Sequence, residues 1–196
     1  MSLRTQPRTP VQTVARSGWC LLFLAITLQL SVHSCVHKIH VAPEPDQVAA
    51  EPMPLTVRVE VPYFLLEGAD HMPGIMLLEW PWKDFRQGVV EYIQKRRSFT
   101  AVGTDHGDVT LSIKAQLALR SHERYVYRVR LDSQLISAKA SSPRTYVVET
   151  EAVGSSVRWV TASDQDPIAD AVRLALNELL TKIEADRALI LAAGKS

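Results

Sequence analysis

The chain has 196 residues, with 22 Lys and Arg against 21 Asp and Glu and a formal net charge of +1. This near-neutral, interspersed charge excludes the basic excess with which nucleic-acid-binding domains neutralise phosphates, so we expect no nucleic-acid partner. The two cysteines are Cys20 and Cys35. The chain after Cys35 therefore has no internal disulfide and must depend on its hydrophobic core.

The first 34 residues have the pattern of a signal peptide. Three arginines precede an apolar run from Trp19 to Leu30, and no acidic residue occurs before Cys35. A basic start, an apolar middle and small residues at the exit are typical of secretory signals. Cleavage after residue 34 would remove the three arginines and leave residues 35–196 with a net charge of −2. The three arginines are Arg4, Arg8 and Arg16.

The stretch Val32-His33-Ser34-Cys35 resembles a bacterial lipobox, in which the cysteine carries the lipid. Val32 and Ser34 suit that motif, whereas His33 departs from it. The resemblance implies lipidation of Cys35 and a membrane anchor in the bacterial cell envelope. In enteric bacteria, an aspartate directly after the cysteine signals against sorting to the outer membrane. Val36 occupies that position here, which favours the outer membrane, facing the periplasm. An uncleaved anchor and an ordinary cleaved signal remain alternatives, although the apolar run is shorter than the roughly 20 residues that span a bilayer.

Residues 35–54 are predicted to be a tether. Four prolines, Pro43, Pro45, Pro52 and Pro54, stand among acidic and small residues without periodicity. Proline-rich segments of this kind form extended, semi-rigid spacers. We expect one globular domain over residues 55–187 and a frayed C-terminal tail over 188–196.

The first elements of the domain follow from local patterns. Residues 55–61 alternate apolar and polar side chains, which predicts a strand that Pro62 ends. Residues 63–79 are broken by Gly and Pro and are predicted to form a long loop with a short strand near 75–78. Apolar side chains then recur at helical spacing over residues 82–97, with Pro81 suited to a first turn.

Strands dominate the next part of the chain. Residues 98–103, 109–119, 125–135 and 145–152 have strand patterns, and 109–119 with 125–135 should form a long antiparallel hairpin. A further strand is predicted at 157–161 and a closing helix at 166–186. We therefore expect an α+β fold: a mostly antiparallel sheet of about five strands, packed on one face by two helices at about 82–97 and 166–186.

Motifs of catalysis are missing from the sequence. There is no Gly-x-Ser-x-Gly elbow, glycine-rich phosphate loop or His-Glu-x-x-His zinc motif. Asp105-His106-Gly107-Asp108 has the composition of a tight turn, which we favour over an acid–base or metal site. The alternative is a hydrolase that uses His106 with Asp105 or Asp108. We expect no enzymatic activity, no catalytic residue, no cofactor and no metal site.

Aromatic side chains are the best candidates for a protein contact. Trp80 and Trp82 flank a proline after an apolar segment that includes Phe64, and aromatic residues are enriched at interface hot spots. The helical phase of Trp82 favours packing in the core over this contact. The basic run Lys95–Arg97 suits a helix C-terminus better than an anionic-lipid site.

The layout as a whole resembles a group of small bacterial envelope lipoproteins. It combines the lipobox at Cys35, the proline-rich segment, a helix followed by Arg97-Ser98-Phe99-Thr100-Ala101-Val102, long strands and a closing helix. The group includes auxiliary lipoproteins of ABC-type transport systems, penicillin-binding-protein activators and curli-secretion-like lipoproteins. The resemblance covers about residues 82–186 and implies a non-enzymatic accessory or assembly partner of an envelope complex, in transport or the cell wall. The alternative, from the apolar residues 64–78, is a periplasmic carrier of lipid or a small hydrophobic ligand.

Overall fold

A computed structural model describes residues 36–38, 40–67, 77–121, 125–137, 142–154 and 165–193. The predicted signal peptide, Cys35 and the predicted strand at 157–161 lie outside the described residues. Among the described residues, no helix is both long enough and apolar enough to cross a bilayer.

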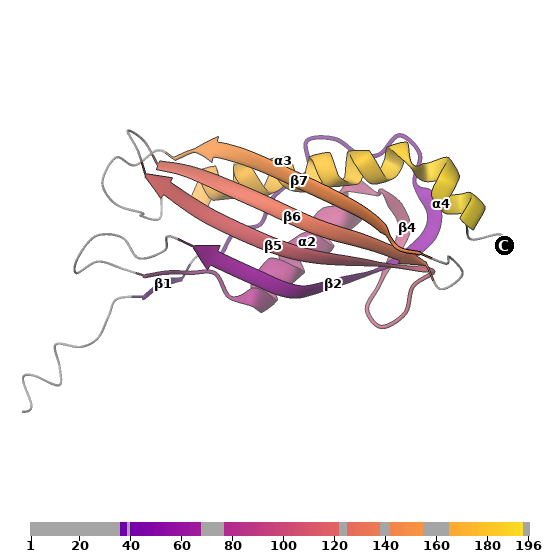
Figure 1. Cartoon of the computed structure of the whole chain (residues 1–196), viewed down its shortest axis with the longest axis horizontal. Helices are drawn as coiled ribbons and strands as arrows, with labels where there is room; N and C mark the ends of the chain where they lie inside the picture. Colours follow the sequence, from indigo (N-terminus) through magenta and orange to yellow (C-terminus); the bar gives the residue numbers. More distant parts are fainter. Residues whose placement is uncertain are drawn as a thin grey trace, which may run out of the picture. The chain divides into compact units, whose positions relative to one another are not determined.

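A five-stranded mixed sheet with the order β4-β2-β5-β6-β7 forms the centre of the domain (Figure 1). β2 is parallel to both β4 and β5, whereas β5, β6 and β7 are antiparallel to one another and make the longer pairings. A separate two-stranded parallel sheet joins β1 to β3. The strands are β1 (Val36–Lys38), β2 (Met53–Glu67), β3 (Leu77–Glu79), β4 (Phe99–Gly103), β5 (Val109–Ser121), β6 (Tyr125–Ser137) and β7 (Arg144–Val153).

Two helices pack on one face of the sheet, as predicted. Helix α2 (Trp82–Arg96) contacts β2 and β4, and α3 (Gln165–Ala185) contacts β6 and β7. The alternating apolar side chains of the hairpin face these helices, and the predicted antiparallel pairing is confirmed, with Leu111 opposite Leu135. The α+β layout predicted from the sequence is therefore confirmed.

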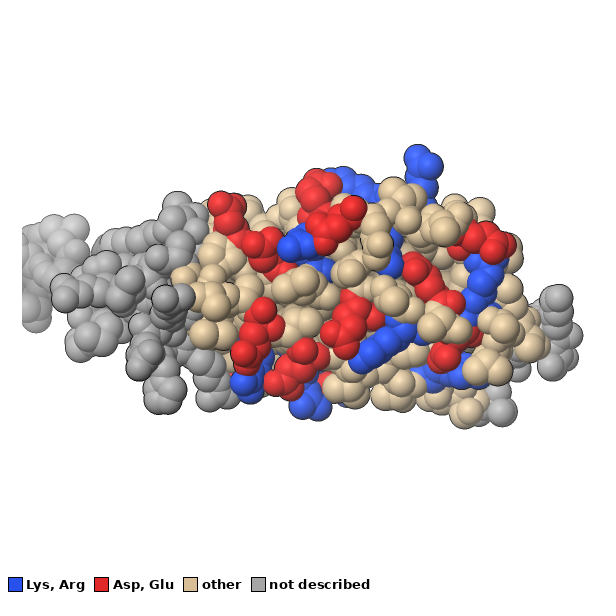
Figure 2. All heavy atoms as spheres, turned by 90° about the horizontal axis from the view of Figure 1, so that it is seen from above, with Lys and Arg blue, Asp and Glu red and all other residues tan. Residues whose placement is uncertain are grey.

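The other face of the sheet is polar, and its charges pair with one another. Arg128 contacts Glu149 at 3.2 Å and Glu151, and Arg130 contacts Asp132 at 3.1 Å. Basic and acidic side chains are likewise interspersed on the side of the molecule shown in Figure 2. Because cations and carboxylates compensate each other locally, this surface has no extended region of one sign.

Pro62 does not end β2, contrary to the prediction. The strand continues to Glu67, with a register shift against β5 between Glu60 and Tyr63. β4 pairs with β2 only as far as Arg58, so Pro62 lies where one side of β2 has no strand partner. Proline lacks an N–H and is tolerated at sheet edges and bulges. The first part of the predicted loop at 63–79 is therefore strand, while the short strand near 75–78 is found at Leu77–Glu79.

Residues 104–108 carry the chain across β2, from β4 on one side to β5 on the other. The Asp108 carboxylate accepts a hydrogen bond from the Thr56 backbone N–H at 2.7 Å. A Cβ on Gly107 would lie 2.7 Å from the Arg58 backbone nitrogen and 2.9 Å from the Thr56 carbonyl oxygen. The glycine is required because the crossing chain touches the backbone of β2. The predicted polar turn at 105–108 is this crossing.

Residues 40–52, which we call the strap, run between α2 and α3 against the domain. Val41 is buried, the Ala49 backbone N–H donates to the Arg96 carbonyl oxygen at 2.7 Å, and Asp46 pairs with Arg173 on α3. Side chains of the strap find partners on both helices, as Glu44 pairs with Lys95 on α2 and Asp46 with Arg173 on α3. The prediction of a free tether is therefore wrong for residues 40–52.

Replacing Gly88 by alanine should stabilise the domain. Gly88 is in the interior of α2, and an added Cβ would lie 3.5 Å from the Val41 carbonyl oxygen and 3.6 Å from Pro43, which is ordinary contact. Alanine is favoured over glycine within a helix by about 0.8–1 kcal/mol. Chemical denaturation should show a gain of that order, whereas a loss would mean that the strap lies closer to α2 than described.

The C-terminal segment is ordered further than predicted. A short helix, α4 (Arg187–Ala193), follows α3 and buries Ile190 in the core. Arg187 donates to the Glu51 carbonyl oxygen and to its carboxylate, each at 2.7 Å. Residues 188–193 are therefore part of the domain and not a frayed tail.

Tyr146 should make stability depend on alkaline pH. Its hydroxyl donates to Asp186 at 3.0 Å, and burial together with this hydrogen bond raises the pKa of Tyr146 to about 12. The unfolded chain would release this proton near pH 10. The Tyr146 hydroxyl therefore contributes fully to the free energy of unfolding below pH 10, and this contribution is lost as the pH rises to about 12. Urea denaturation at pH 8 to 12 should show a steeper decline for the wild type than for Tyr146→Phe. Parallel declines would contradict this.

Candidate functional site

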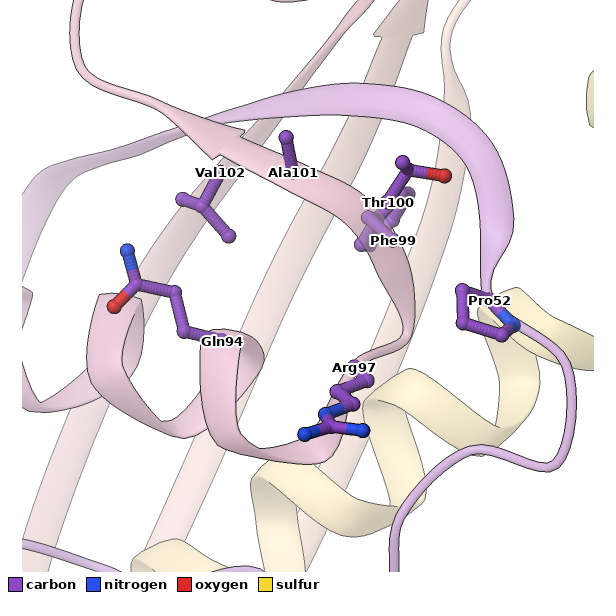
Figure 3. Close-up of a pocket in the computed structure, with 7 residues that line it drawn as sticks. All are labelled: Pro52, Gln94, Arg97, Phe99, Thr100, Ala101 and Val102. Carbon is purple, nitrogen blue, oxygen red and sulfur yellow. The ribbon is translucent and has the colours of Figure 1, made fainter.

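A hollow lies between the C-terminal end of α2 and β4 (Figure 3). Its volume is about 370 Å³. Gln94 and Val102 lie at one end and Pro52 at the other. We call this hollow the β4 groove; it is lined by Pro52, Gln94, Arg97, Phe99, Thr100, Ala101 and Val102.

The β4 groove follows an outer strand of the sheet. Among the described strands, β4 has a hydrogen-bonded partner only on its β2 side, and Thr100 and Ala101 are exposed. An edge strand presents unpaired backbone N–H and C=O groups that can pair with another extended chain. At the opposite edge, side chains connect β7 to α3: Lys182 donates to the Val147 carbonyl oxygen, and Thr150 to that of Ala171, each at 3.0 Å. The Val147 carbonyl of β7 is therefore already occupied by a side chain of α3.

Arg97 has an unusual backbone conformation at this groove. It ends α2 with φ 60° and ψ 34°. No other non-glycine residue in the described part of the chain has a positive φ. This left-handed position after a helix is most often glycine, because a side chain there costs roughly 1–2 kcal/mol. An arginine at this position keeps a cationic side chain beside β4 at the expense of stability.

The three cations of the predicted basic run have different roles. Lys95 pairs with Glu44 of the strap. Arg96 is buried and contacts Glu184 on α3 through two nitrogens, each at 3.2 Å. Arg97 is exposed, and no acidic side chain in the described ranges pairs with it. The run is not one cationic patch, and only Arg97 has a charge available at the groove.

The predicted aromatic contact is divided between core and surface. Phe64 stacks on Phe85 with ring centroids 4.5 Å apart, and Trp80 packs edge-on against both rings. Trp80 is only 4% exposed and is a core residue, which removes it from any accessible contact. Trp82 is 44% exposed, so the helical phase misplaced it in the core; its indole N–H donates to the Val61 carbonyl oxygen at 2.7 Å.

Residues 105–108 lie in the crossing between β4 and β5. Asp108 is engaged with the backbone of β2, and His106 is exposed at the surface. No group of three or more His, Cys, Asp or Glu side chains within the described ranges is placed to hold a metal ion. The β4 groove itself offers an outer strand, apolar side chains and the charge of Arg97.

Neither a protein-family model nor a curated protein sequence matches the chain. Solved structures of similar layout include a Xanthomonas campestris protein of family DUF330, which is 17% identical with a TM-score of 0.49 and covers 82% of this chain and 99% of its own. An uncharacterised protein is 11% identical with a TM-score of 0.42, covering 77% of this chain and 98% of its own. A Caulobacter crescentus protein described as a "putative lipoprotein" is 15% identical with a TM-score of 0.35, covering 70% and 92%.

Proposed function

We propose that the protein is a non-enzymatic lipoprotein of the bacterial cell envelope, anchored through Cys35, whose domain binds an extended segment of an envelope protein along β4. The observation that carries the binding role is the β4 groove, where an edge strand, a hollow of about 370 Å³ and the cation of Arg97 come together. The lipobox resemblance at Cys35 supports the anchor. Outer-membrane location follows from the sorting resemblance at Val36 and is part of the proposal.

Strand addition fits the chemistry of this groove. A partner strand beside β4 would satisfy backbone groups that now face solvent, while its side chains contact Phe99, Ala101 and Val102. Backbone pairing gives affinity, and side-chain pockets give specificity. The charge of Arg97 favours a segment with an acidic residue at that position, because complementary charges fix register and select the partner.

The variant Arg97→Gly separates binding from stability. Glycine removes the left-handed strain, so the free energy of unfolding should rise by about 1 kcal/mol. The same change removes the cation from the groove and should weaken partner binding about tenfold. A stabilised protein with unchanged binding would show that Arg97 has no part in recognition, and a destabilised protein would contradict the account of its backbone.

Photo-crosslinking in cells tests the groove itself. A photoreactive amino acid at Ala101, on β4, should capture one defined envelope protein, and addition of Arg97→Gly should reduce the yield. The matched control is Val153, which is 56% exposed on β7 at the opposite edge. Equal capture of the same protein from both positions, or none from Ala101, would overturn the proposed binding role.

A further inference from the structure

The chain directly after Cys35 is fixed to one end of the domain. Val36 pairs with Leu77 and Lys38 with Glu79 in the β1–β3 sheet. Two residues further on, the His40 Nδ1 lies 2.8 Å from an Asp84 carboxylate oxygen in the first turn of α2. The described residues that follow Cys35 therefore lie in the β1–β3 sheet, and His40 lies beside the start of α2.

Two exposed aromatic side chains lie at this same end. Trp82 begins α2, and its indole N–H donates to the Val61 carbonyl oxygen. Tyr63, two residues after Val61 on β2, is 49% exposed. Tyr63 pairs with Lys114 of β5 and so belongs to the polar face of the sheet. Leu77 and Trp82 are five residues apart, which limits their separation to about 17 Å even for a fully extended chain. His40 contacts Asp84, two residues after Trp82, so Trp82 lies near the point where the chain after Cys35 joins α2.

Tryptophan and tyrosine are the side chains that most favour the boundary between water and lipid. Their rings enter the apolar side of the headgroup region while their polar atoms stay hydrated. A lipid at Cys35 would hold this end of the domain against the bilayer, so the cost of bringing the rings to the surface is already met.

We propose that the end of the domain that carries Trp82 and Tyr63 rests in the headgroup region of the bilayer to which Cys35 is anchored, an inference that depends on the lipidation proposed above. Trp82 begins the 15-residue helix α2, whereas the β4 groove lies at the C-terminal end of that helix, about 20 Å away. This orientation leaves the β4 groove away from the bilayer, where a partner segment can reach it.

Single-cysteine labelling tests this orientation in the lipidated, full-length mature protein. No cysteine follows Cys35 in the sequence, and the Cys35 thiol is consumed by its lipid, so an introduced cysteine is labelled alone. A polarity-sensitive fluorophore is attached to Tyr63→Cys, Trp82→Cys or the control Leu189→Cys. Leu189 on α4 is 54% exposed. Arg187 of the same helix pairs with Glu51, just before β2 begins, so α4 lies at the other end of β2. The proteins are reconstituted in vesicles of phosphatidylethanolamine and phosphatidylglycerol.

The expected result is blue-shifted emission at positions 63 and 82, with quenching by spin-labelled lipid at least threefold stronger than at position 189. Equal, water-like emission at all three positions in protein that floats with the vesicles would overturn the orientation and leave the anchor intact. Protein that does not float with the vesicles would overturn both. Because positions 63 and 82 are read in separate variants, loss of one folded variant leaves the other as the test.

Discussion

Replacing Arg96 by methionine should lower the free energy of unfolding by about 3 kcal/mol, a size expected when one partner of a buried ion pair is removed. The Arg96 guanidinium is 2% exposed and contacts Glu184, Asn177 and Thr181 on α3. Its loss leaves these acceptors without their donor, although Glu184, which is 25% exposed, regains some hydration. Urea denaturation measures the change.

Two further variants show whether the Arg96 effect comes from burial. Lys95→Met, one position earlier on the exposed side of α2, should change stability by less than about 0.5 kcal/mol. The double variant Arg96→Met with Glu184→Leu should recover much of the loss, because it removes both charges together. If Arg96→Met were as mild as Lys95→Met, Arg96 would not connect α2 to α3 as described.

Replacing Gly107 by alanine should destabilise the domain by about 2–3 kcal/mol, in the range of overpacked sites. All three close neighbours of the added Cβ are backbone atoms, at 2.7 to 2.9 Å, so no side-chain rotation can relieve the contact. The crossing at 104–108 would have to move away from β2, which also breaks the hydrogen bond from Thr56 to Asp108.

Two matched variants isolate this steric effect. Gly88→Ala adds the same methyl group to a site with room for it and is expected to stabilise. His106→Ala changes an exposed side chain next to Gly107 and should leave stability unchanged. A Gly107→Ala protein as stable as the wild type would mean that the crossing does not touch β2.

Local patterns were sufficient to predict the hairpin and both long helices. Alternation over residues 109–119 and 125–135 determined which side chains face the core, because a shift of one residue would expose the whole apolar set. Helical spacing similarly located α2 and α3 to within two residues of their ends. Helical spacing wrongly placed Trp82 in the core. Trp82 is exposed in the first turn of α2, and Trp80, which precedes the helix, is buried instead.

The strand order could not be predicted, because it depends on contacts between distant residues. Nothing local to residues 55–61 indicates that β2 is parallel to both β4 and β5, or that its second half has a free side where Pro62 is tolerated. The β4 groove was missed for the same reason, since it exists only once β4 is an edge. The left-handed conformation of Arg97 was not indicated by the sequence either, because glycine, which usually marks such a position, is absent there.

The strap was missed because composition was a poor guide to packing. Prolines and acidic residues are typical of free spacers, but here Glu44, Asp46 and Glu51 each pair with a basic residue on a helix. Those basic residues are 50 or more positions away in the sequence, so only the folded structure reveals the pairing. The domain therefore begins closer to Cys35 than predicted.

Mass spectrometry of the mature N-terminal peptide tests the central claim, lipid attachment at Cys35, most directly. Trypsin cuts after Lys38, so the processed protein should yield the peptide of residues 35–38 with the added mass of a thioether-linked diacylglycerol, and Cys35→Ala should abolish it. The control Cys20→Ala should leave the lipidated peptide unchanged. An unmodified peptide from Ser17 to Lys38, or a mature chain that starts elsewhere, would contradict the account.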